Sequence, residues 1–204
     1  MHHRFVAAIF LAIVVNSTGV QPLRAEPASA SAVVGNFHGH LLGVMKEAKS
    51  LSVDDRFQRL SAPIDAAFDL WRMIRVAASP QWKSAVQPER QKLFDTFRRL
   101  SIATYAAQFD GYSGQQFKTM GERPGPQKTV LVATKIIETD GDAVGLTYVM
   151  KKTASRWLIA DVLLDDSISQ LAVRRSEYRH ILKKSGIEGL EATLSAKADT
   201  LLAD

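Results

Sequence analysis

The feature that most constrains the fold is a change of hydrophobic period in the middle of the chain. In four successive segments, at residues 115–123, 128–138, 143–153 and 156–165, the helical spacing gives way to a two-residue period, and apolar residues alternate most clearly in the last three. Short runs of turn-forming residues join them, at 123–126, 140–142 and 153–155. Such alternation is typical of β-strands, and connections this short join antiparallel neighbours. The sequence therefore predicts a four-stranded antiparallel meander.

A helical spacing of apolar residues is found on both sides of these strands. The predicted helices cover residues 33–45, 53–70, 71–78 and 88–110 before the strands, and 169–184 and 187–201 after them. The helix at 88–110 is the clearest, because Pro88 and Glu89 suit its first turn and an apolar stripe follows. Helices, a meander and further helices make the fold class α+β. We expect a curved sheet that packs on the long helix at 88–110.

The first 25 residues have the layout of a secretory signal peptide. A short basic start precedes eleven uncharged residues, 5–15, which are too few to span a bilayer comfortably. Cleavage is expected after Ala25 or as late as Ala30; retention of the segment as an anchor is the alternative. Residues 26–32 are then a linker rich in Pro, Ala and Ser, and residues 33–204 form the folded domain. An exported chain of this kind is expected in the periplasm.

Composition excludes several classes of function. The chain has 204 residues and no Cys, which excludes a disulfide scaffold, an iron–sulfur protein, a thiol enzyme and a Cys-ligated zinc site. Residues 1–25 contain two arginines and no acidic residue, so their removal leaves 24 basic and 21 acidic residues. So small an excess, with no basic run interleaved with aromatic residues, argues against a nucleic-acid partner.

Patterns for catalysis and metal binding are weak. His38 and His40 are two residues apart on a predicted helix and do not share a face, so we expect no metal site there. The strongest enzymatic candidates are Asp161, Tyr148 and Tyr105, which would form an acid/base pair in a hollow beside the sheet. We treat that arrangement as the alternative, and predict that the protein has no catalytic residues and no cofactor.

The predicted strands offer nearly all-apolar faces to the helix at 88–110, and a curved sheet can enclose a hollow there. Periodicity alone does not separate a filled core from a lined cavity, so both interpretations stay open. If the hollow exists, its walls are expected to be Tyr105, Phe109, Val132, Leu146, Tyr148, Met150, Leu158, Ala160 and Val162. These strand residues are chosen by alternation, because side chains two positions apart share a face.

Two adjacent arginines, Arg174 and Arg175, lie within the apolar stripe of a predicted helix. At least one of them must approach the core. The simpler interpretation is a buried stem whose charged end reaches the surface or pairs with Asp161, Asp165 or Asp166. The functional interpretation is a guanidinium at the mouth of a cavity, and Arg175 is the candidate for contact with an anionic head group.

Residues 163–178, LLDDSISQLAVRRSEY, resemble the MlaC-type (toluene-tolerance) family of periplasmic phospholipid-binding proteins that assist ABC transport. Trp157 with Asp161-Val162, Thr104-Tyr105-Ala106 and Gly186-x-x-Gly189-Leu190 fit the same family. Residues 168–177 are similar to its hopanoid-biosynthesis-associated branch, as are Phe68-Asp69-Leu70 with Met73 and Pro80-x-Trp82. The family's usual Gly-Val-Ser and Asn-Tyr-Arg become Ser167-Ile168-Ser169 and Val173-Arg174-Arg175, which leaves open whether the ligand is a phospholipid or a hopanoid.

This resemblance implies a sheet-and-helix fold similar to nuclear-transport-factor-2-like domains, with a helical subdomain and a cavity for acyl chains. It implies a carrier that moves lipid between envelope membranes as the soluble component of an ABC-type transport system. We expect the protein to be a monomer. Its partners would be an inner-membrane transporter complex and an outer-membrane acceptor or donor. The alternatives are an enzyme of the same fold that acts on a lipid, and a scaffold in hopanoid biosynthesis that carries no lipid.

Overall fold

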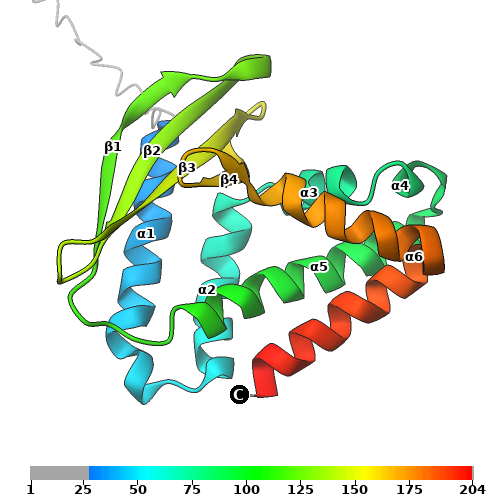
Figure 1. Ribbon diagram of the computed structural model, residues 1–204, viewed down its shortest axis with the longest axis horizontal. Helices are drawn as coiled ribbons and strands as arrows, with labels where there is room; N and C mark the ends of the chain where they lie inside the picture. Colours follow the sequence, from blue (N-terminus) through cyan, green and yellow to red (C-terminus); the bar gives the residue numbers. More distant parts are fainter. Residues whose placement is uncertain (1–27, 204) are drawn as a thin grey trace, which may run out of the picture.

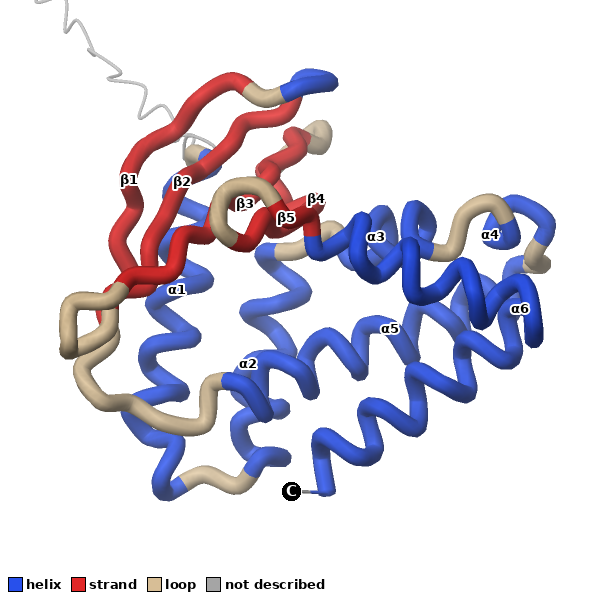
Figure 2. Tube along the Cα trace, in the orientation of Figure 1, coloured by secondary structure: helices blue, strands red, loops and turns tan. Residues whose placement is uncertain are grey.

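The computed structural model describes residues 28–203, in which helices precede and follow an antiparallel sheet (Figures 1 and 2). The helices are α1 (Ala30–Glu47), α2 (Val53–Ala67), α3 (Leu70–Ala77), α4 (Gln81–Ser84), α5 (Gln87–Gln108) and α6 (Gln170–Ala203), with short 3-10 turns at Ala48–Ser50 and Pro126–Lys128. The strands are β1 (Gln116–Pro124), β2 (Thr129–Ile137), β3 (Ala143–Lys152), β4 (Trp157–Leu164) and β5 (Ile168–Ser169). The α+β class is confirmed.

The sheet has five strands in the order β1-β2-β3-β4-β5, so the prediction of four strands is wrong. The added strand follows a tight turn in which Asp165 and Asp166 have φ angles of 48° and 57°. The N–H of Ser167 donates to the carbonyl of Leu164 at 3.2 Å and closes this turn. Two successive residues with positive φ are the signature of a type I′ hairpin, and aspartate tolerates that conformation. A strand of two residues is too short to show alternation in the sequence.

A β-bulge decides which residues of β4 face inward. Tyr148 pairs with Val162, but two positions further along β3 Met150 pairs with Ile159, so β4 carries one extra residue, Ala160. Paired residues share a face, so the bulge places Ile159 on the inner face beside Met150. Simple alternation along β4 would have placed Leu158 and Ala160 there.

The helix inside the curve of the sheet is α1, and not the long helix α5 (Figure 1). Helix α1 contacts β1, β2 and β4, whereas α5 packs against α2, α3 and α6. The prediction that the sheet packs on the helix at 88–110 is therefore wrong along most of its length. It is the C-terminal end of α5 that approaches the sheet, where the rings of Phe109 and Phe117 lie 6.5 Å apart. Both helices have an apolar stripe, and the stripes alone do not say which one the sheet covers.

Helix α1 begins earlier than its apolar pattern indicates. Its first residue is Ala30, and the side chain of Ser29 caps it by accepting the N–H of Ala32 at 3.1 Å. Residues 30–32, which we expected in a linker, are thus part of the folded domain. The predicted signal peptide at 1–25 lies outside the described residues. Among the helices that the structure describes, none is both long and apolar enough to cross a membrane.

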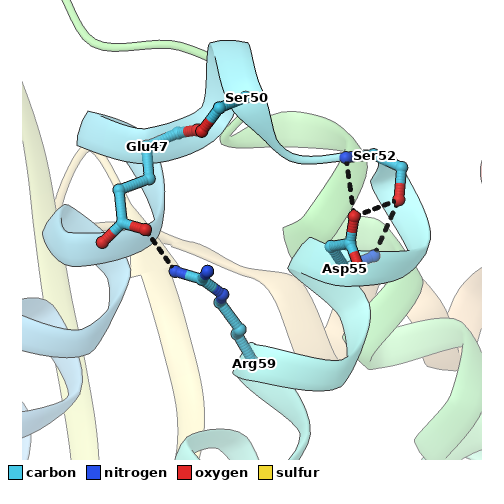
Figure 3. A network of polar contacts seen from close by, with 5 residues as sticks. All are labelled: Glu47, Ser50, Ser52, Asp55 and Arg59. Atoms are coloured by element: carbon cyan, nitrogen blue, oxygen red, sulfur yellow. Dashed lines mark hydrogen bonds and ion pairs between the residues drawn. The ribbon is translucent and has the colours of Figure 1, made fainter.

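Polar contacts fix the turn between α1 and α2 (Figure 3). Ser52 and Asp55 form a capping box, in which the Ser52 hydroxyl accepts the N–H of Asp55 at 3.1 Å and the Asp55 carboxylate accepts the N–H of Ser52 at 3.2 Å. Arg59, one turn further along α2, forms an ion pair of 2.5 Å with Glu47 at the end of α1. These contacts set the angle at which α2 leaves α1 and returns toward the sheet.

Helix α6 is two helical arms joined at Gly186, where the chain turns sharply back (Figure 1). Gly186 has a φ of 65° and a ψ of −163°, a backbone conformation that is essentially restricted to glycine. The break that the sequence predicts between residues 184 and 187 is therefore confirmed. Helix α6 contacts both α3 and α5, and its first arm runs beside α3 (Figure 1).

Candidate functional site

A cavity of about 490 Å³ lies where the sheet, the helices α2 and α3, the end of α5 and the start of α6 converge. The apolar side chains of its wall are Leu41, Ile64, Phe68, Leu70, Met73, Phe109, Phe117, Ile136, Val144, Leu146, Val162 and Leu164. Val144 is 39% exposed, so the cavity reaches the protein surface at this end of the sheet. The other wall residues carry polar groups, and they are Ser101, Thr104, Tyr105, Gln108, Glu138, Tyr148, Gln170 and Arg174. A mainly apolar wall with polar groups at some positions is typical of a small-molecule or lipid site.

The residues predicted for the cavity wall divide into two groups. Tyr105, Phe109, Leu146, Tyr148 and Val162 line the cavity, whereas Val132, Met150, Leu158 and Ala160 do not. Val132 and Met150 are fully buried in the packed core, although Val132 pairs directly with the cavity residue Tyr148. Leu158 and Ala160 leave the inner face because of the bulge. The filled core and the lined cavity are therefore adjacent on one sheet face.

Much of the wall comes from helical residues that the strand pattern did not indicate, among them Leu41, Ile64 and Met73. One sequence signal coincides with the wall: Phe68, Leu70 and Met73, which are similar to the hopanoid-associated branch, all line the cavity. A helical stripe by itself does not show whether it borders a core or a hollow.

The junction between α2 and α3 is attached directly to the sheet. The N–H of Asp69 donates to the carbonyl of Ile159 at 2.9 Å, and Phe68 forms an isolated bridge with the same residue. The Asp69 side chain in turn accepts the N–H of Arg72 at 3.1 Å and caps α3. The break between the two helices is thus fixed against β4, which places Phe68 in the cavity wall.

His38 and Tyr148 form a buried polar pair next to the cavity, and Tyr148 is itself part of the wall. The ring of His38, on α1, stacks on Phe117 at 4.4 Å, and its Nε2 lies 2.8 Å from the Tyr148 hydroxyl. Burial lowers the pKa of His38 to about 4 and raises the pKa of Tyr148 well above its ordinary value, so both groups are neutral at pH 7. Burial also raises the pKa of Tyr105 to about 12, an increase that the charge of Arg174 opposes. These groups are unsuited to proton transfer near neutral pH.

The acid/base arrangement of Asp161 with Tyr148 is not formed. Asp161 pairs with Val149, one position beyond Tyr148 on β3, and so lies on the other face of the sheet. Its carboxylate accepts the N–H of Leu171 at 2.9 Å and the hydroxyl of Ser169 at 2.5 Å, while Ser169 accepts the N–H of Ala172 at 2.9 Å. Asp161 and Ser169 together cap α6. In the part of the chain that the structure describes, no cluster of three or more His, Asp or Glu side chains is arranged to hold a metal ion.

The structure places Arg174, and not Arg175, in the wall of the cavity. Arg175 is exposed and borders a separate surface hollow with Arg75 and Arg90, so its predicted position at the cavity mouth is wrong. The guanidinium of Arg174 lies over the ring of Phe97, with its central carbon 5.3 Å from the ring centroid. No ion pair joins Arg174 to Asp161, Asp165 or Asp166, all of which are described residues.

Comparisons with known proteins agree with this architecture. A protein-family model described as MlaC protein matches residues 36–196. Among solved structures, the chain is similar to a phospholipid-binding protein from Ralstonia solanacearum in complex with a phospholipid, with a TM-score of 0.74 and 22% sequence identity over 85% of this chain and 99% of that one. At this identity the likeness establishes the fold alone. Because the family model spans well over half of the sequence, the chain belongs to the MlaC family.

Proposed function

We propose that this protein is a periplasmic carrier that binds phospholipid and moves it between the membranes of the cell envelope. The observation that carries the proposal is the apolar cavity of about 490 Å³ between the sheet and the helices. Membership of the MlaC family and the phospholipid bound to the similar Ralstonia protein support it. The neutral His38–Tyr148 pair and the capping role of Asp161 favour a binding protein over an enzyme.

The size of the cavity fits an acyl chain. A methylene group is about as large as a water molecule, which takes up about 30 Å³, so the cavity has room for roughly 16 such groups. Each methylene removed from water contributes about 0.8 kcal/mol, so a chain of that length is strongly retained against transfer to water. A membrane offers the chain a similar environment, so exchange between the cavity and a bilayer is close to balanced. A carrier needs this combination.

Export by an N-terminal signal peptide is part of the proposal. Cleavage after Ala25 suits the fold better than cleavage after Ala30, because the latter removes Ser29, the residue that caps α1. In the periplasm we propose two docking partners, an ABC-type transporter complex at the inner membrane and a lipid acceptor or donor at the outer membrane. The motifs of the hopanoid-associated branch keep a hopanoid as the alternative ligand.

A vesicle transfer experiment tests the carrier function. Donor vesicles contain a fluorescent phospholipid together with a quencher that does not exchange, and acceptor vesicles contain neither. We expect the purified protein to accelerate the gain of fluorescence in proportion to its concentration, and the heat-unfolded protein to have no effect. A protein that binds the lipid but leaves the transfer rate unchanged would be a static binder or a scaffold, contrary to the proposal.

A further inference from the structure

Arg174 stands between two hollows of the protein. It lines the large cavity together with Gln170, one helical turn before it on α6. It also lines a second hollow of about 350 Å³ between α5 and the two arms of α6, whose apolar walls include Leu100, Tyr178 and Leu194. Thr104 is the other residue that borders both. The guanidinium is therefore at the junction of two partly apolar spaces.

The charge of Arg174 is incompletely satisfied by the protein. Its Nη1 is buried and has no hydrogen-bond partner among the described residues. Glu138 borders the large cavity and Glu177 the smaller hollow, but neither forms an ion pair with Arg174 in the described part of the chain. The ring of Phe97 is one aromatic neighbour, at 5.3 Å, and Tyr178 and Tyr105 are two others. A buried cationic nitrogen without a partner is unfavourable, and an anion that reaches it removes this penalty.

The position of Arg174 is fixed by the start of its helix. Asp161 and Ser169 accept the first free N–H groups of α6, from Leu171 and Ala172. The cap therefore holds the first turns of α6 against β4 and directs Arg174 toward the cavity. A side chain that is held in place in this way gains more from an ionic ligand than a free surface arginine does.

We infer that Arg174 binds the phosphate of the lipid, with the acyl chains entering the two hollows on either side of it; this inference rests on the proposed function. The planar guanidinium presents paired N–H donors that match phosphate oxygens. A phosphate at the junction lets one chain enter the large cavity and the other enter the hollow between α5 and α6. A ligand without an anionic group leaves Nη1 unpaired, so the site selects phospholipids over neutral lipids of equal length.

The test compares two ligands with the same acyl chains, phosphatidylglycerol and diacylglycerol, each added in trace amounts to the delipidated protein. The variants are Arg174→Met, Arg174→Lys and the neighbouring, exposed Arg175→Met as the matched control. We expect the unmodified protein to bind phosphatidylglycerol roughly 10- to 100-fold more tightly than diacylglycerol, as a charge-assisted hydrogen bond implies. Arg174→Met should lose this preference while still binding diacylglycerol, Arg174→Lys should keep part of it, and Arg175→Met should keep all of it.

Each other outcome overturns a defined statement. Equal affinity of the unmodified protein for both lipids, or a full preference in Arg174→Met, contradicts the role of Arg174 and leaves the carrier function standing. Binding of neither lipid contradicts the carrier function itself. Competition by millimolar inorganic phosphate that displaces phosphatidylglycerol would show a site for free phosphate and also overturn the inference. If Arg174→Met fails to fold, the decision passes to Arg174→Lys, whose preference must fall below that of Arg175→Met.

Discussion

The Nε2 atom of His38 lies 2.8 Å from the hydroxyl of Tyr148 in the interior of the protein. The two residues are 110 positions apart in the sequence, on α1 and β3, and each is almost completely buried. Tyr148 and Phe117, which both contact the His38 ring, line the cavity. The pair therefore fixes α1 to the sheet directly behind the proposed lipid site.

Stability should decrease in mild acid because of His38. Burial lowers its pKa from 6.5 to about 4, so between these values the unfolded chain binds a proton that the folded protein does not. The contribution of His38 is complete above pH 6.5 and is lost as the pH falls toward 4, by up to roughly 3 kcal/mol. Denaturant unfolding at a series of pH values measures it. His38→Gln should flatten the profile in this range and His40→Gln, an exposed change on the same helix, should not; equal profiles for all three proteins would refute the assignment.

Asp161 should contribute to the stability of the fold and not to catalysis. Asp161→Ala removes the acceptor for the Leu171 N–H and the partner of Ser169, and is expected to lower the free energy of unfolding by about 1–2 kcal/mol. Asp161→Asn keeps an oxygen acceptor and should cost less. Thermal melts of the two variants check the order. Identical losses in both, together with a loss of any lipid-modifying turnover, would favour the enzyme alternative.

The same change, valine to phenylalanine, at two positions tests whether the space is a cavity or a packed core. Val162 lines the cavity. Val132 is on the same sheet but is fully buried and does not line the cavity. Val162→Phe should fill part of the cavity, reduce bound lipid and change stability little. Val132→Phe should overpack the core and lower the free energy of unfolding by about 1–3 kcal/mol. Denaturation midpoint and lipid content are measured on both; if Val162→Phe is destabilised as strongly as Val132→Phe, the space is a packed core.

The turn in α6 should require glycine. A Cβ at Gly186 meets no neighbouring atom within 4 Å, so the effect of Gly186→Ala comes from the backbone conformation at a φ of 65°. We expect a loss of about 1–3 kcal/mol in the free energy of unfolding. Gly35→Ala, in an exposed position inside α1 that is equally open, should instead stabilise by about 0.5–1 kcal/mol. If Gly186→Ala leaves the free energy of unfolding unchanged, the arms of α6 adopt a different geometry in solution.

The sequence predicts those parts of this fold that depend on local pattern. Four strands and the break at Gly186 follow from alternation and from a glycine after a basic turn. The bulge at Ala160 does not, because β4 is apolar at nearly every position and tolerates either face inward. The local pattern also does not show whether Arg174 or Arg175 faces the cavity. Adjacent helical residues point about 100° apart, and only the packing of α6 on α5 decides which of the two enters the cavity.

The most direct test of the central claim is the lipid content of the protein itself. The exported protein is purified without detergent, extracted with organic solvent and examined by mass spectrometry, with protein quantified in the same sample. We predict lipid in near-stoichiometric amount, and phospholipid as its class if the phosphate of the ligand lies at Arg174. A hopanoid in that extract would keep the carrier function and correct the ligand. Correctly folded protein that repeatedly yields no lipid after this mild purification would contradict the account.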